Sequence, residues 1–119
     1  MQKLREPIEC SNPWFTYIKN GEKTVEGRKQ SSIFKSIYVG EILKFILKDS
    51  NEYFYTKVVD IKYYTTLEDY LMSTGVKNCL PGVQLLEEGI KIYTQWSTLE
   101  EINEVGFMGI HLQVCNIIN

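Results

Sequence analysis

The sequence lacks the residue patterns that mark a metal site or a disulfide framework. Its 119 residues include three cysteines and one histidine, and no Cys-x-x-Cys pair is present. An odd and widely spaced set of cysteines is typical of reduced thiols, so we expect no metal, no cofactor and an intracellular location, cytoplasmic or nuclear. Cys115 lies in an apolar run and is predicted to be in the core.

Long apolar runs and a charged-then-apolar leader are also missing, which predicts a protein that is neither secreted nor bound to a membrane. There is no basic excess either: 13 Lys and Arg face 15 Asp and Glu, a net charge of −2. Proteins that hold long duplexes normally show a basic face. Any nucleic-acid function must therefore depend on a local pocket. The length predicts a single domain, residues 1–119.

The familiar catalytic patterns are absent as well. No glycine-rich loop is followed by the Lys-Ser/Thr pair that would hold a phosphate. His111, the only histidine, lies in the last apolar run and is predicted to be structural, since no defensible Ser/His/Asp or Cys/His arrangement includes it. The sequence therefore has to be interpreted from its charged and aromatic residues.

The first predicted element is a helix over "NPWFTYIKNG". Asn12 is a good N-cap, Pro13 suits the first helical position, and Gly21 is typical of a helix end. An extended segment should follow from Lys23 to Arg28. The next segment, "SSIFKSIYVG", is predicted to be a turn or a helical loop.

The runs "EILKFILK" and "YFYTKVVDIKYY" flank a turn cluster and predict a β-hairpin. Thr66 is a candidate N-cap for a helix that ends at Gly75, and "KNCLPG" is predicted to be a loop. The segment "VQLLEEGIKIYTQW" is ambiguous. Ser97 with Glu100 predicts a capping box, and "FMGIHLQVCNII" a final central strand. These elements predict an α+β fold: a small, mostly antiparallel barrel or curled sheet with helices at its mouth.

Charge is concentrated in the extended segment. Period-two alternation places Thr24, Glu26 and Arg28 on one face, and Lys23, Val25 and Gly27 on the other. A carboxylate near a guanidinium stays ionised and can accept a hydrogen bond from a base or a sugar. The alternative is that these are solvated charges on an edge strand. Spacing alone favours that alternative.

The stretch "PWFTYIKNGEKTVEGR" resembles the signature of the ASCH domain, a branch of the PUA-like β-barrel superfamily. The family's mark is a Gly-x-Lys-x-x-Glu-x-Arg run directly after an amphipathic helix. Gly21, Lys23, Glu26 and Arg28 match every marked position. Later parts of the chain are also similar to the family: "YVGEILKF", Pro81-Gly82, "IYTQW-S" and "GFMGIHLQV". The resemblance therefore covers nearly the whole chain, although only the first motif is specific.

The resemblance implies a PUA-like barrel with a cleft between the first helix and the strands, and it implies binding of RNA or a nucleotide. We accordingly expect a ligand site in which Lys23 and Arg28 take phosphate or carbonyl groups and Glu26 takes a base amine. Trp14 or Tyr17 could supply a stacking surface. The full predicted set of ligand-binding residues is Trp14, Gly21, Lys23, Thr24, Glu26 and Arg28.

Two other interpretations stay open. One branch of the family removes acyl groups from cytidine and another is a ribonuclease, so the chain could be a metal-independent hydrolase with Lys23 and Glu26 catalytic. The branch that removes acyl groups is proposed to use a Lys, a Thr and a Glu as catalytic residues. The position of its Thr is occupied here by Glu26, which is a departure from that branch. Its catalytic Glu has no secure counterpart in this sequence, and Glu87 and Glu88 are the candidates. Thr24 could supply an oxyanion donor. The third interpretation is a protein-interaction domain in which the charge cluster is structural.

Overall fold

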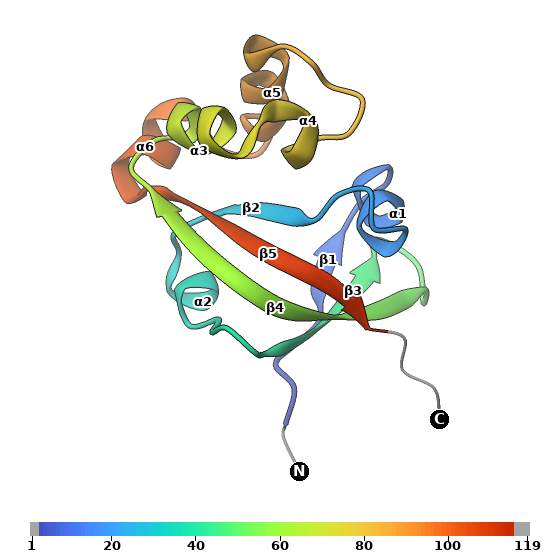
Figure 1. Ribbon diagram of the computed structural model, residues 1–119. Coiled ribbons are helices and arrows are strands. Elements are labelled where there is room, and N and C mark those ends of the chain that lie inside the picture. The colour runs from blue at the N-terminus through green and yellow to red at the C-terminus, as the bar shows by residue number, and fades with distance from the viewer. Residues whose placement is uncertain (1–2, 116–119) are drawn as a thin grey trace.

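The computed structural model describes residues 3–115, which form one curled β-sheet with helices packed against it (Figure 1). The strands of this part of the chain are β1 (Ile8–Cys10), β2 (Val25–Lys29), β3 (Ile42–Leu47), β4 (Tyr53–Tyr64) and β5 (Phe107–Cys115). They lie in the order β1-β3-β4-β5-β2. Neighbours are antiparallel, except that β1 and β3 are parallel. The predicted α+β class with a mostly antiparallel sheet is confirmed.

The sheet is a half-barrel whose two edges are β1 and β2. Within residues 3–115 no ladder of backbone hydrogen bonds joins these two edges. The predicted hairpin is confirmed as β3 and β4, in which Leu43 lies opposite Thr56. Strand β1 was not predicted, and it adds to the sheet through Ile8 opposite Phe45 of β3. The half-barrel therefore has an open side between β1 and β2.

The helices of the described residues are α1 (Trp14–Lys19), α2 (Ser32–Lys35), α3 (Leu67–Thr74), α4 (Val76–Cys79), α5 (Leu86–Tyr93) and α6 (Leu99–Val105). Figure 1 shows α3 to α6 gathered as one group over the sheet, with α1 and α2 apart from it. The predicted helical loop after β2 is α2. The group of four helices packs on the part of the sheet that contains β2 and β5.

The start of α1 differs by one residue from the prediction. The helix begins at Trp14, and Pro13 occupies the cap position that was assigned to Asn12. Asn12 still caps the helix, because its Oδ1 accepts a hydrogen bond from the backbone N–H of Thr16 at 3.1 Å. Gly21 follows the helix with a φ of 81°, as expected of a residue at a helix end.

The capping box of α6 is also displaced by one residue. Ser97 and Glu100 were predicted to form it, but Thr98 and Glu101 do so. Both pairs have the spacing that a capping box requires. Starting at Thr98 places Ile102 at the fourth helical position, where it is 1% exposed. Core packing therefore decides between two caps that are locally equivalent.

The segments around α4 and α5 correct one prediction and resolve one ambiguous assignment. Thr66 caps α3 and Gly75 ends it, as predicted. The first part of the expected loop after Gly75 is the short helix α4, which corrects that prediction. The ambiguous segment contains α5, and its Gly89 is buried against α3, where an added Cβ would lie 3.3 Å from Leu71 Cδ1. A glycine in this helix lets α5 pack closely on α3.

Two hydrophobic clusters form the interior. One lies between the sheet and α1, and the other between the helical group and strands β2 and β5. Trp14 packs against both clusters. Cys10 belongs to the first cluster and Cys79 to the second, and both are free thiols. Cys115 is only half-buried, so its predicted place in the core is wrong.

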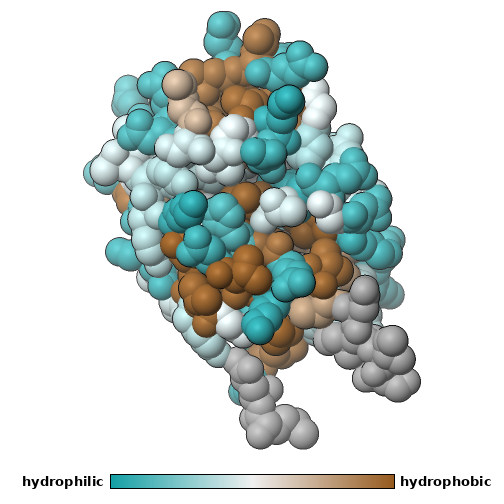
Figure 2. Space-filling model, in the orientation of Figure 1, coloured by the Kyte–Doolittle hydropathy of each residue, from teal (hydrophilic) through white to brown (hydrophobic). Residues whose placement is uncertain are grey.

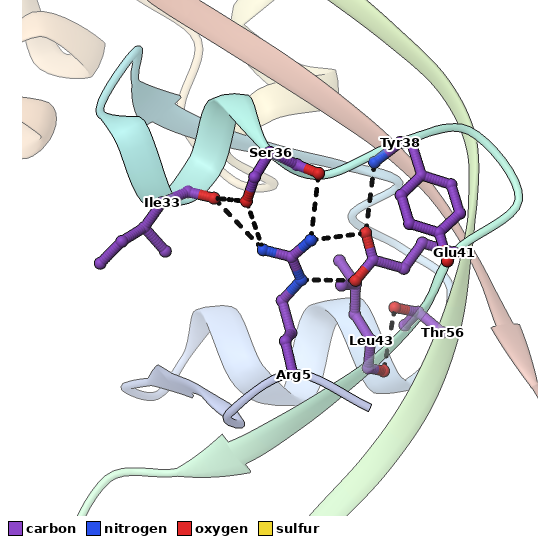
Figure 3. A network of polar contacts seen from close by, with 7 residues as sticks. All are labelled: Arg5, Ile33, Ser36, Tyr38, Glu41, Leu43 and Thr56. Carbon is purple, nitrogen blue, oxygen red and sulfur yellow. Dashed lines mark hydrogen bonds and ion pairs between the residues drawn. The ribbon is translucent and has the colours of Figure 1, made fainter. Parts of the chain in front are cut away.

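A partly buried ion pair connects the N-terminal segment to the start of β3 (Figure 3). Arg5 donates to both carboxylate oxygens of Glu41, at 2.5 Å and 2.8 Å. Its remaining donors reach the backbone carbonyls of Ile33 and Ser36 and the hydroxyl of Ser36. Because α2 also carries Phe34, this network fixes the helix that positions that ring.

The surface in Figure 2 mixes hydrophobic residues over the helices and over the sheet with hydrophilic residues between them. Large exposed apolar side chains occur on both layers, such as Met72 on α3 and Tyr63 on β4. Scattered exposure of this kind is ordinary in folded domains. No helix in residues 3–115 has the length and apolar character needed to cross a membrane.

Candidate functional site

A cleft of about 450 Å³ lies on the open side of the half-barrel. Both edge strands line it, together with parts of α1, α2 and the segment that joins α5 to α6. This volume is within the range of pockets that hold small ligands. Its lining includes Glu9 of β1, Glu26, Gly27 and Arg28 of β2, Phe34 of α2, and Trp96.

Three charged side chains meet at this cleft. Arg28 donates to Oε2 of Glu26 from Nη2 at 2.7 Å and from Nε at 3.0 Å. Nζ of Lys23 lies 3.6 Å from Oε1 of Glu26 and donates to the carbonyls of Val25 at 2.6 Å and Cys79 at 2.5 Å. Lys23 is 2% exposed and Glu26 is 6% exposed. Lys23 therefore directs its ammonium at three protein acceptors, whereas Arg28 reaches the solvent-facing side of the cluster.

The opposite charges at this cluster favour one another's ionised forms, in opposition to burial. Burial by itself would raise the pKa of Glu26, but the charges of Arg28 and Lys23 outweigh it and lower that pKa. Burial lowers the pKa of Lys23, and Glu26 opposes that shift. The carboxylate of Glu26, 3.6 Å from Nζ, favours the ammonium form, which also donates to the two backbone carbonyls. Burial, with the charge of Glu26, raises the pKa of Cys10 to about 12, so this thiol in the cleft is neutral.

The face assignment from alternation is correct for two of these residues. Glu26 and Arg28 lie on one face of β2 and form an ion pair. Lys23 was placed on the opposite face, yet its side chain reaches Glu26. Strand β2 begins at Val25, so Lys23 lies before it and does not follow its period of two.

Arg28 also spans the open side of the half-barrel. Its Nη2 donates to the carbonyl of Glu9 on β1 at 3.3 Å. Its guanidinium lies over the ring of Phe34, 5.0 Å from the ring centroid. Nη1 of Arg28 has no hydrogen-bond partner within residues 3–115. The guanidinium is thus held in place and still has donors to offer.

Aromatic side chains border the cleft. Trp14 lines it, while Tyr17 does not. Tyr93 and Trp96 also line it, and Trp96 is 69% exposed. Neither of these two was predicted as a site residue. A tryptophan in the polar stretch "YTQWST" was the available signal, but nothing in the sequence placed that stretch beside β2.

The predicted ligand-binding residues divide between two places. The cleft is lined by Trp14, Lys23, Glu26 and Arg28. A separate hollow of about 340 Å³ is lined by Gly21 and Thr24, and it reaches Lys23 from another direction. Thr24 therefore does not face the cleft as an oxyanion donor would.

The remaining candidates lie elsewhere. Glu87 and Glu88 are exposed at the start of α5 and do not line the cleft. His111 is half-buried on β5, and burial together with Lys62 lowers its pKa. Among the described residues no group of three His, Cys, Asp or Glu side chains could hold a metal ion.

The model of the ASCH domain family matches residues 8–112. The chain belongs to the ASCH domain family. The matched range includes the Gly-x-Lys-x-x-Glu-x-Arg motif of this ASCH domain, so the motif residues at the cleft lie within the family region. No curated protein matches the chain.

Two solved structures share the fold of this ASCH domain. The crystal structure of hypothetical protein PH0355 is 28% identical, with a TM-score of 0.81, and the match covers 92% of this chain and 97% of that one. The solution NMR structure of protein PF0455 from Pyrococcus furiosus is 24% identical, with a TM-score of 0.74, covering 94% and 100% of the two chains. Neither protein's name states a ligand or an activity, and the second likeness supports the fold alone.

Proposed function

We propose that this ASCH domain binds RNA or a nucleotide in the cleft between β1 and β2. The observation that carries the proposal is the partly buried Glu26–Arg28 ion pair, which lines a cleft bordered by aromatic residues, of which Trp96 is exposed. An ionised carboxylate accepts from base amines, and a guanidinium donates to phosphate or carbonyl groups. A single nucleotide can carry both kinds of group, an amine on its base and the oxygens of its phosphate.

The cations at the cleft support an anionic ligand. Lys29 and Lys48 line it together with Arg28. Trp96 offers an exposed ring on which a base can stack, a contact worth roughly 1–3 kcal/mol per base. A local arrangement of this kind needs no basic surface elsewhere, which agrees with the net charge of −2.

Binding is better supported than hydrolysis. A catalytic Lys23 would have to give up or take a proton, but its ammonium is directed at Glu26 and two backbone carbonyls. Thr24 lies outside the cleft, and the Cys10 thiol is neutral. The same contacts suit a lysine that holds Glu26 in place for a ligand.

Titration with the four ribonucleoside monophosphates and with a short single-stranded RNA tests the proposal. We expect Trp96→Ala to weaken binding about tenfold, because it removes a stacking surface. Calorimetry would measure the affinity, and the melting temperature should stay unchanged because Trp96 is exposed. The matched control is Tyr63→Ala, which removes an exposed ring on β4 that does not line the cleft.

Three results would contradict the proposal. If neither the nucleotides nor the RNA bind the wild-type chain, the cluster is structural and the protein-interaction hypothesis gains support. Release of free cytidine from acylated cytidine, lost in Lys23→Met, would instead favour the hydrolase. Equal weakening by Trp96→Ala and Tyr63→Ala would place the ligand outside the cleft.

A further inference from the structure

Strand β2 pairs with β5 on one side only, and two hydrogen bonds define which backbone groups face β5. The N–H of Leu112 donates to the carbonyl of Thr24 at 2.8 Å, just before the strand. The N–H of Gln30 donates to the carbonyl of Gly106 at 3.0 Å, just after it. Hydrogen-bonded pairs alternate along an antiparallel ladder. Glu26 therefore turns its backbone groups toward β5, as does every even-numbered residue of β2.

The odd-numbered residues turn their backbone N–H and C=O toward the open side. Two of the three carbonyls are already occupied. The carbonyl of Val25 accepts from Lys23 Nζ at 2.6 Å, and that of Lys29 accepts from the N–H of Ser31 at 2.7 Å. Within residues 3–115 neither the N–H nor the C=O of Gly27 has a hydrogen-bond partner.

Gly27 is buried, and it lines the cleft. More than nine-tenths of buried backbone polar groups in folded proteins are hydrogen-bonded, so an unpaired donor beside an unpaired acceptor requires an explanation. The backbone is also held firmly: an added Cβ would lie 2.6 Å from Phe107 Cε2 and 2.7 Å from Tyr70 Oη. The rings behind the strand thus fix Gly27, and its free groups are available to a ligand in the cleft.

A ligand that satisfies both groups must have an acceptor next to an N–H donor. The pairing edge of each nucleobase has this arrangement: an imino N–H beside a carbonyl in uracil and guanine, and an amine beside a ring nitrogen in cytosine and adenine. We propose that the backbone N–H and C=O of Gly27 bind the pairing edge of an unpaired nucleobase, an inference that rests on the proposed function of the cleft. The cleft then takes a free nucleotide or a single-stranded RNA and rejects a base-paired one.

Nucleotides with a blocked pairing edge test the inference on the wild-type chain. Each of the four monophosphates is compared with a partner methylated on its pairing edge: at the imino nitrogen for uracil and guanine, and twice on the exocyclic amine for cytosine and adenine. For the nucleotide that binds most tightly, we expect the methylated partner to bind about tenfold more weakly, because a lost buried hydrogen bond leaves Gly27 unpaired. Stacking and phosphate contacts are the same in both partners.

Amide NMR spectra of the isotope-labelled chain locate the contact. We expect the Gly27 resonance to shift on titration, and the Gly40 resonance, from an exposed turn before β3, to stay in place. A second binding test compares a short RNA in its single-stranded and double-stranded forms. The single strand should bind, and the same strand annealed to its complement should bind about tenfold more weakly or not at all.

The failures of the two proposals are distinguishable. If methylated and unmethylated nucleotides bind equally, or the duplex binds as well as the single strand, the cleft still binds nucleotides but Gly27 does not contact the pairing edge. A Gly27 resonance that does not move with bound nucleotide leads to the same conclusion. Absence of any binding overturns both proposals.

Discussion

At position 23 a charged ammonium is buried, which costs free energy unless its donors are satisfied. The carbonyls of Val25 and Cys79 and the carboxylate of Glu26 supply the three acceptors. Cys79 lies in α4, so Lys23 connects the helical group to the start of β2. Its buried contacts therefore join these two parts of the structure.

We therefore predict that Lys23→Met lowers the free energy of unfolding by about 3 kcal/mol, since removing one partner of a buried pair leaves the others unsatisfied. Urea unfolding measures this change. The control is Lys19→Met, because Lys19 also forms an ion pair, 3.0 Å from Glu52, but is exposed. Its effect should stay within about 0.5 kcal/mol. Equal stabilities of the two variants would show that the buried contacts of Lys23 contribute little.

At the scale of the element, β2 is held between an open edge and the helical group. Gly27 packs directly against Phe107 of β5 and Tyr70 of α3. A glycine inside a strand often marks such a close approach. Because Gly27 has no side chain, Tyr70 of α3 can approach the backbone of β2 closely. Helix α3 therefore covers β2, which places the helical group beside the cleft.

We predict that Gly27→Ala destabilises the chain by about 1–3 kcal/mol, the usual cost of overpacking, because neither ring can move without disturbing its neighbours. Thermal and urea unfolding would measure it. The control is Gln113→Ala on β5, an exposed position in the same sheet. If Gly27→Ala is as stable as wild type, the rings can shift and the strand is less constrained than its contacts indicate.

For the whole molecule, the net charge of −2 limits how RNA can be held. The cations that line the cleft are Arg28, Lys29 and Lys48, besides the buried Lys23. Each phosphate contact on a single strand contributes about 0.7 to the slope of log affinity against log salt. We predict a shallow slope of about −2 for a short single strand, measured by titration across a range of salt concentrations. A slope steeper than about −4 would mean that cations outside the cleft take part.

Local signals predicted most of the fold. The hairpin β3–β4 follows from two β-rich runs around a polar turn, and the ends of α1 and α3 follow from Gly21 and Gly75. Strand β1 was missed because three residues are too few for a periodic pattern and its partner β3 is far along the chain. The choice of Thr98 over Ser97 as a cap depended on which helix phase buries Ile102.

The sequence by itself determined the α+β class, the charged strand and the side-by-side placement of Glu26 and Arg28, because each depends on residues close together in the chain. Only the tertiary structure decided that Lys23 is enclosed by Cys79, and that Trp96 borders the cleft. The same holds for the unpaired backbone of Gly27, which results from the half-barrel staying open between β1 and β2. These features depend on contacts between segments distant in sequence, which no local pattern encodes.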